Sequence, residues 1–114
     1  MKTIIVINYT KLCLSELSGN KIKNFVEEAY NNNEKTLFDF YGITKFATSF
    51  FNYVFGTYIL KYGIEKYNSL IEVTNLTELG NELYSKSVEN AIKQSKMNSD
   101  EKVRVENFFK DLEE

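Results

Sequence analysis

The chain contains no histidine and no proline, and only one cysteine among its 114 residues. Without histidine, the side chain that most often serves as a general base or metal ligand near neutral pH is missing, and a Cys–His nucleophile cannot form. A single cysteine cannot close an internal disulfide, which favours a reducing compartment. We expect Cys13 to be a packing residue, because free cysteine is commonly buried and no imidazole is present to activate it.

Positive charge is not in excess either. The chain carries 14 Lys and Arg residues against 16 Asp and Glu residues, for a net charge of −2. A surface that follows a phosphate backbone needs clustered Lys and Arg side chains. We therefore expect no nucleic-acid partner.

No apolar run is long enough to cross a bilayer. The most apolar stretch, residues 50–60, is interrupted by Asn52, Gly56 and Thr57. The N-terminus lacks a basic segment followed by an apolar core, so we expect no signal peptide. Together with the lone cysteine, these features predict a cytoplasmic protein that has no membrane partner.

Motifs of catalytic or cofactor sites are missing as well. No Gly-rich loop joins a predicted strand to a helix, so neither a P-loop nor a dinucleotide-binding turn is expected. The carboxylates are spread along predicted helix faces, and pairs such as Glu27 and Glu28 are typical of solvated surface. Neither a metal site nor a pair of carboxylates with separated pKa values is indicated. We predict that the chain is not an enzyme and binds no cofactor.

Apolar residues make up 43% of the chain and aromatic residues 15%, which is enough for one domain with a sizeable core.

Residues 2–8 form a β-branched run that predicts a strand covered on both faces. Residues 9–18 fit either a short strand or an extended loop. From Asn20 the pattern predicts a helix with Ser18, Gly19 and Asn20 as capping candidates. Residues 31–33 are expected to end it.

Residues 35–40 predict a second strand, followed by a turn at Tyr41 and Gly42. A strand, a helix and a strand with short connections predict a parallel pair. The segment after Thr48 is apolar nearly all round as far as Tyr62, which predicts a helix inside the core or at a partner surface. Gly56 within this helix suggests that a neighbouring backbone approaches closely.

Asn68 and Ser69 predict a turn, and residues 70–74 predict a third strand. Asn75 and Glu78 have the spacing of a capping box, which would open a long amphipathic helix. The predicted fold of residues 1–97 is an α/β domain with a mainly parallel sheet of about three to five strands and covering helices. One core is expected to contain the apolar residues Ile5, Phe25, Phe38, Val54 and Ile71.

Residues 98–114 predict an extra C-terminal helix that Ser99 and Asp100 can cap. Its apolar stripe has the spacing i, i+3, i+4, i+7 and consists of Val105, Phe108, Phe109 and Leu112. Leaving such a stripe in water is unfavourable, so it should pack on its own domain or on a second copy. We favour its own domain, because an intramolecular contact loses less entropy than association does.

Thr48 and Ser49 stand at the predicted start of the apolar helix. Helix capping alone explains one of these hydroxyls. Their position after a core strand is where open α/β sheets place ligand crevices, and a helix N-terminus favours anions. A phosphate on Thr48 would add about two negative charges to an apolar docking surface.

Residues 37–59, LFDFYGITKFATSFFNYVFGTYI, resemble the central segment of an uncharacterised STAS-like family found in bacteria and phages. The resemblance rests on four short matches, which are Asp39-Phe40, Gly42-Ile43, Thr48-Ser49-Phe50 and Phe55-Gly56. It extends more weakly from Gly19 to Asn75.

More distantly, the segment resembles the anti-sigma factor antagonists. In those proteins an Asp-Ser-Ser-Gly step heads the same helix, and a partner kinase phosphorylates its first Ser. Here Thr48 takes the phosphoacceptor position and Ser49 the second Ser, while Ala47 and Phe50 replace the Asp and the Gly.

The resemblance implies a non-enzymatic regulatory module that binds a protein, for example a histidine-kinase-like ATPase. It makes Thr48 and Ser49 candidate phosphoacceptors. The expected partner-binding residues are Asp39, Thr48, Ser49, Asn52 and Tyr53. One alternative is a structural or self-associating protein that uses its apolar helix faces. Another is a phage or defence-system component that sequesters a host protein.

Overall fold

The computed structural model describes residues 1–96. The first half of the chain contains the strand β1 (Lys2–Ile5), the 3-10 turn η1 (Val6–Asn8), the helix α1 (Glu16–Asn32) and the strand β2 (Thr36–Asp39). The second half contains α2 (Thr48–Phe51), the π-helical turn η2 (Asn52–Gly56), α3 (Thr57–Tyr62), α4 (Ile64–Leu70), β3 (Ile71–Thr74) and α5 (Glu78–Lys96). The predicted extension, residues 98–114, lies outside the described residues.

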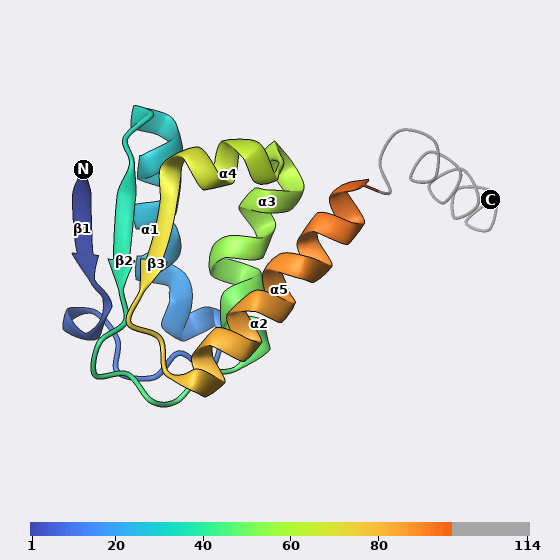
Figure 1. The fold of residues 1–114 in the computed structure, drawn as a ribbon. Coiled ribbons are helices and arrows are strands. Elements are labelled where there is room, and N and C mark those ends of the chain that lie inside the picture. Colours follow the sequence, from blue (N-terminus) through green and yellow to red (C-terminus); the bar gives the residue numbers. More distant parts are fainter. Residues whose placement is uncertain (97–114) are drawn as a thin grey trace, which may run out of the picture.

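The three strands form one parallel sheet in the order β1-β2-β3, so the predicted parallel α/β fold is confirmed (Figure 1). In its register, Ile4 lies beside Phe38 and Phe38 lies beside Val73. Each crossover between neighbouring strands contains helix, as parallel pairing requires. The central strand β2 therefore ends next to the carboxyl ends of both other strands.

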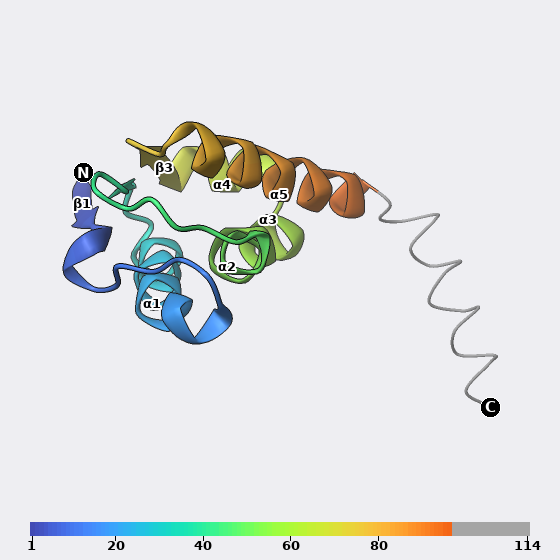
Figure 2. The same cartoon turned by 90° about the horizontal axis from the view of Figure 1, so that it is seen from below.

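Only one face of this sheet is covered by helices among the described residues. Helix α1 lies against that face (Figure 2), and Ile4 and Phe38 are buried. Ile5 points to the other face and is 38% exposed. The predictions that residues 2–8 form a strand covered on both faces and that Ile5 is a core residue are wrong. The strand ends at Ile5, and side chains of a strand alternate between the two faces.

The helices α2 and α3 and the turn η2 between them run on without a break, and we call them together the 48–62 helix. This helix lies between α1 on one side and α5 on the other. It buries the side chains of Phe50, Phe51, Val54 and Phe55 completely. A helix that is apolar on so many sides is stable here because neighbours cover both sides.

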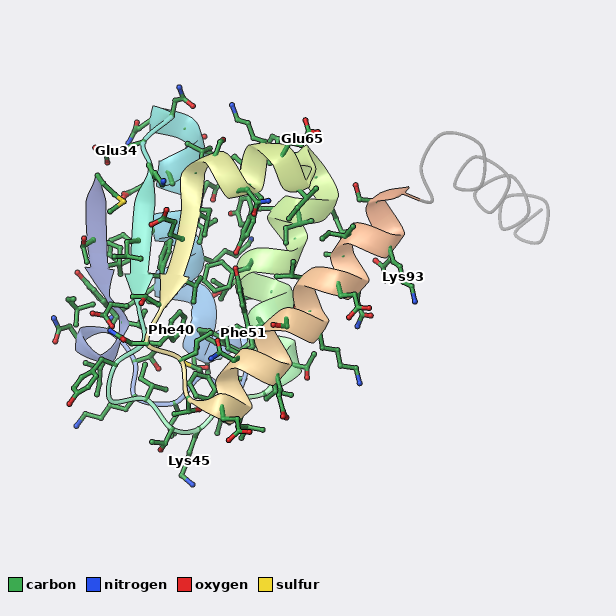
Figure 3. The ribbon with its side chains drawn as sticks, in the orientation of Figure 1. Glu34, Phe40, Lys45, Phe51, Glu65 and Lys93 are labelled. Atoms are coloured by element: carbon green, nitrogen blue, oxygen red, sulfur yellow. The ribbon has the colours of Figure 1, made fainter. Side chains whose placement is uncertain are left out.

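The core is dominated by phenylalanine. The rings of Phe40 and Phe51 are 6.1 Å apart between their centroids and fill the space between sheet and helices, whereas Lys45 and Lys93 lie at the periphery (Figure 3). Phe38, Val54 and Ile71 are buried as predicted, and Phe25 is half-buried against the same cluster. The predicted core is thus confirmed apart from Ile5.

Helix α1 begins earlier than predicted. Its N-cap is Ser15, whose side chain accepts from the backbone N–H of Ser18, while the Ser18 side chain accepts from the backbone N–H of Ser15. This reciprocal pair satisfies two backbone donors that a helix start leaves free. The predicted start at Asn20 is therefore wrong. At the other end Asn33 adopts a left-handed conformation with φ of 50°, which confirms the predicted stop.

The prediction that a neighbouring backbone approaches Gly56 closely is wrong, and the close contact between helices lies at Gly19 instead. A Cβ atom at Gly56 would meet the Ser87 Oγ atom at 3.5 Å, which is an ordinary contact. At Gly19 in α1, a Cβ atom would lie 2.7 Å from the Cγ2 atom of Val54. Gly19 therefore lets α1 approach the 48–62 helix more closely than any side chain would allow.

Two predictions about the segment before α5 are wrong. Asn68 and Ser69 belong to α4, where the Ser69 hydroxyl donates to the Lys66 carbonyl at 2.7 Å. The residue that caps α5 is Thr77, whose Oγ1 accepts from the backbone N–H of Gly80 at 3.1 Å. Asn75 instead adopts a left-handed conformation with φ of 59°.

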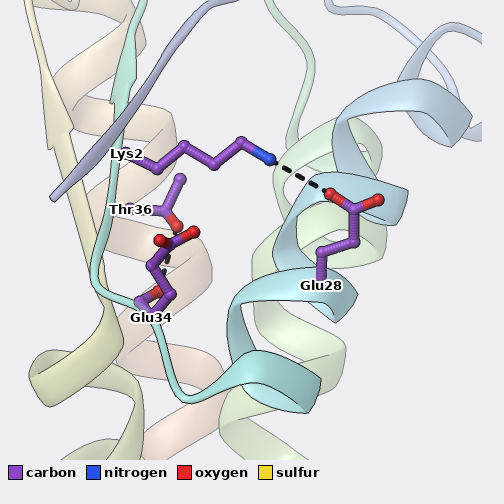
Figure 4. A network of polar contacts seen from close by, with 4 residues as sticks. All are labelled: Lys2, Glu28, Glu34 and Thr36. Atoms are coloured by element: carbon purple, nitrogen blue, oxygen red, sulfur yellow. Dashed lines mark hydrogen bonds and ion pairs between the residues drawn. The ribbon is translucent and has the colours of Figure 1, made fainter.

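Polar contacts join the amino end of β1 to α1 and the amino end of β2 to the loop before it (Figure 4). The Lys2 Nζ atom lies 3.2 Å from a carboxylate oxygen of Glu28, and the Thr36 hydroxyl donates to the Glu34 carbonyl at 3.1 Å. Both partners of the ion pair are about half exposed, so it contributes at most about 1 kcal/mol.

Within residues 1–96, no helix combines the length and the apolar character needed to cross a membrane.

Candidate functional site

A short backbone pairing fixes the start of the 48–62 helix. The N–H of Cys13 donates to the Lys45 carbonyl at 3.1 Å, and the N–H of Ala47 donates to the Cys13 carbonyl at 2.9 Å. This parallel bridge between Cys13 and Phe46 is what the ambiguous segment at residues 9–18 forms. The first turn of the helix is therefore held against a loop that is distant in sequence.

The two predicted hydroxyls lie in this first turn. The N-cap is Ala47, so neither Thr48 nor Ser49 caps the helix with its side chain. The Ser49 hydroxyl donates to the Leu14 carbonyl at 3.1 Å. Thr48 is half-buried, and within residues 1–96 no hydrogen bond engages its hydroxyl. The two adjacent hydroxyls thus differ, because that of Ser49 is engaged with the Leu14 carbonyl and that of Thr48 is not hydrogen-bonded within residues 1–96.

Three exposed leucines lie in the segment that pairs with the start of this helix. Leu12, Leu14 and Leu17 are 48%, 41% and 82% exposed, and the Leu14 carbonyl is the acceptor of the Ser49 hydroxyl. We call the surface formed by Leu12, Leu14, Leu17, Thr48 and Ser49 the Thr48 edge. The sequence did not assign these leucines to the site, because they alternate only loosely with polar residues and fit either a short strand or an extended loop. Three leucines within the six residues 12–17 were the feature of the sequence that could have indicated an apolar surface here.

Asp39 lies at the carboxyl end of the central strand. Its Oδ1 atom accepts from the backbone N–H of Tyr41 at 2.9 Å and from the Asn75 side chain at 3.0 Å. Asn75 follows β3, so the Asp39 carboxylate joins the loops that leave two neighbouring strands. Asp39 is bonded to neither Thr48 nor Ser49.

Asn52 and Tyr53 occupy the turn η2 and face different helices. The Asn52 Oδ1 atom accepts from the Ser87 hydroxyl of α5 at 2.5 Å. The Tyr53 hydroxyl donates to the Asn20 side chain of α1 at 2.5 Å. Of the predicted partner-binding residues, Thr48 and Ser49 therefore lie in the first turn of the 48–62 helix, and Asn52 and Tyr53 lie one turn further along it.

A groove of about 510 Å³ runs beside these two residues, between the 48–62 helix and α5. Its lining comes from Glu16, Asn52, Tyr53, Gly56, Thr57, Leu60, Ser87, Asn90, Ala91, Lys93 and Gln94. Gly56 and Ala91 are buried beneath the groove, while Leu60 is 40% exposed. The π-helical turn forms part of one wall, and such turns are frequent at functional sites.

Cys13 is completely buried, which confirms its predicted packing role. Burial raises the pKa of its thiol to about 12. A thiolate is the reactive form of cysteine, and it does not form here near neutral pH.

Tyr67 is buried in the core, and Tyr30 and Tyr84 are half-buried against it. The hydroxyls of Tyr67 and Tyr84 are 2.7 Å apart, so one of them donates a hydrogen bond to the other. Burial raises the pKa of Tyr67 well above its ordinary value and also raises that of Tyr84. The ring of Tyr30 stacks on Tyr62 at 4.7 Å between centroids, and burial raises its pKa as well.

Across residues 1–96, no three side chains of the His, Cys, Asp or Glu type are arranged to hold a metal ion.

The family model of a STAS-like domain of unknown function (DUF4325) matches residues 18–81, which is more than half of the chain. The matched part begins in the first turn of α1 and ends in the first turn of α5, so it includes β2, β3 and the 48–62 helix. No curated protein and no solved structure shows a significant match to the chain.

Proposed function

The chain belongs to the family of STAS-like domains of unknown function, and on this basis we propose that it is a non-enzymatic regulatory module that binds a protein partner through its Thr48 edge. The observation that carries the proposal is the exposure of Leu12, Leu14 and Leu17 in the segment that the Cys13–Phe46 bridge and the Ser49 hydroxyl hold against the helix start. Apolar side chains gathered on a surface mark interaction sites more often than isolated ones do.

The Thr48 hydroxyl supplies the regulation in this proposal. Thr48 takes the phosphoacceptor position of the anti-sigma factor antagonists, and the partner is then a histidine-kinase-like ATPase. Phosphorylation would add about two negative charges beside the three leucines. An uncompensated charge is costly inside an apolar interface, so the modified domain would release its partner.

A pair of leucine substitutions tests the docking surface. Leu17→Asp places a charge in the Thr48 edge, whereas Leu79→Asp makes the same change at a leucine of α5 that is 50% exposed and lies outside that edge. Each full-length variant is used to capture partners from the native host, and captured proteins are quantified by mass spectrometry. A specific partner, such as an ATPase, should be lost with Leu17→Asp and retained with Leu79→Asp. Equal capture by both variants would contradict the proposal.

The same exposed leucines also fit a second function, which is self-association through the Thr48 edge. Light scattering on the wild type and on Leu17→Asp separates the two. A wild-type dimer that becomes a monomer with Leu17→Asp favours self-association, whereas a monomeric wild type leaves the edge for another protein.

A further inference from the structure

The groove between the 48–62 helix and α5 has a floor of small residues. Gly56 and Ala91 are buried at its base, and Ser87 and Asn52 are already hydrogen-bonded to each other. Leu60 stands at its side, 40% exposed. A floor without bulky side chains, next to an exposed leucine, is suited to receive large apolar side chains from outside.

We propose that the occupant of this groove is the chain's own C-terminal segment, residues 99–112, which docks as an amphipathic helix antiparallel to α5. The surface differs from the Thr48 edge, so this inference is independent of the proposed function. In this inference Asn52 and Tyr53, which line the groove, contact the chain's own C-terminal segment and not a separate partner protein.

The position at which α5 ends supports this occupant. The last described turns of α5 contribute Lys93 and Gln94 to the groove. The chain continues for 18 residues beyond Lys96. Residues 97–99 are enough for a short connection between antiparallel helices, and Ser99 and Asp100 can cap a second helix.

The register that such a hairpin requires also fits. If the turn is centred near residue 98, Val105 comes to lie opposite Ala91, and Phe109 opposite Ser87. Both of these α5 residues line the groove. On α5 the lining extends from Ser87 to Gln94, about 10 Å at a rise of 1.5 Å per residue. In this register the stripe from Val105 to Leu112 lies opposite residues 84–91 of α5, so its part from Val105 to Phe109 faces the groove lining between Ser87 and Ala91.

The sizes of the side chains are complementary as well. The apolar stripe of the segment contains two adjacent aromatic residues, Phe108 and Phe109. The groove offers Gly56 and Ala91 beneath them. Helices that carry apolar residues at i, i+3, i+4 and i+7 commonly dock in grooves of this kind.

Charge substitutions in the full-length chain test the inference. The double variant Phe108→Asp with Phe109→Asp alters the stripe, and Asn107→Asp with Lys110→Gln changes the net charge by the same amount on the opposite side of the segment. We expect the first variant to shift the amide NMR signals of Gly56, Leu60 and Ala91 at unchanged monomer mass, and the control to leave them in place. Unshifted signals in the first variant would overturn the inference.

A cross-link distinguishes the chain's own segment from that of a second copy. Leu60→Cys is combined with Phe108→Cys in the full-length chain, and the buried Cys13 is kept. Mild oxidation should produce a monomer of altered mobility on a non-reducing gel. A disulfide-linked dimer as the main product would show that the groove holds the segment of another copy and would overturn the inference.

Discussion

The Thr48 hydroxyl and its neighbour at Ser49 have different surroundings, although the two residues are adjacent in the sequence. Ser49 holds the Leu14 carbonyl at 3.1 Å, and Thr48 has no such partner within residues 1–96. A substitution at Ser49 therefore disturbs the loop at the Thr48 edge, whereas a substitution at Thr48 tests the edge itself. This difference selects Thr48 for the experiment on regulation.

Thr48→Glu is expected to weaken partner binding without unfolding the domain. An acidic side chain is favourable in the first turn of a helix but is penalised inside an apolar interface. Thr48→Ala should leave binding nearly intact and cost less than about 1 kcal/mol, because Thr48 is not the N-cap. Partner affinity and the urea midpoint of each variant are measured together. Equal affinities for Thr48→Glu and Thr48→Ala would contradict the phospho-switch.

At the scale of elements, the packing of α1 on the 48–62 helix depends on the missing side chain of Gly19. We expect Gly19→Ala to destabilise the domain by roughly 1–3 kcal/mol, because the added methyl group would lie 2.7 Å from Val54 and 3.3 Å from Phe50. Gly56→Ala is the matched control, since its methyl group would meet Ser87 at an ordinary 3.5 Å. Urea unfolding of both variants measures the difference. A larger loss at Gly56 would show that the helices approach each other at a different point.

The central strand gives a second prediction at this scale. Phe38 is completely buried, and its ring lies 5.4 Å from that of Phe55 between centroids. Phe38→Ala should cost about 3–5 kcal/mol, because it removes a large apolar side chain and leaves a cavity. Leu37→Ala removes a half-buried side chain on the other face of the same strand and should cost less. A loss below about 1 kcal/mol for Phe38→Ala in urea unfolding would contradict the assigned face.

The sequence predicts the long helices well, because their apolar residues recur with a clear period, and it locates the three strands from short apolar runs. The start of α1 was missed since its capping box uses Ser18 where Glu or Gln is usual. The helix α4 was missed because Asn68 and Ser69 favour turns, and because its start depends on Gly63, which has φ of 90°. The position of Thr48 and Ser49 at a helix start was predicted correctly, but the pairing of Cys13 with Phe46 joins distant segments and has no local signal.

At the scale of the whole molecule, the raised pKa of the buried Tyr67 predicts a loss of stability at alkaline pH. Burial raises the pKa of Tyr67 well above its ordinary value of 10.0, so the folded state keeps a proton that the unfolded state loses above pH 10. The unfolding free energy should therefore be constant from pH 7 to about pH 9 and decrease above pH 10. Each such tyrosine lowers it by about 1.4 kcal/mol per pH unit.

Urea unfolding between pH 7 and pH 12 measures this decrease. Tyr67→Phe should reduce the slope above pH 10, because it removes one titrating group. Tyr41→Phe, at an exposed position, should leave the slope unchanged. An unfolding free energy that stays level up to pH 12 in the wild type would contradict this account.

The parallel register of the sheet has a consequence for the rate of folding. Ile4 pairs with Phe38 and Phe38 with Val73, so each strand pairing closes a loop of about 35 residues, and no hairpin can form the sheet locally. Chains dominated by such distant contacts fold more slowly than helical bundles. Because the chain has no proline, prolyl isomerisation adds no slow step. Stopped-flow refolding should therefore show one exponential phase on the millisecond-to-second scale, and a phase of tens of seconds would point to an obstacle other than closure of these two loops.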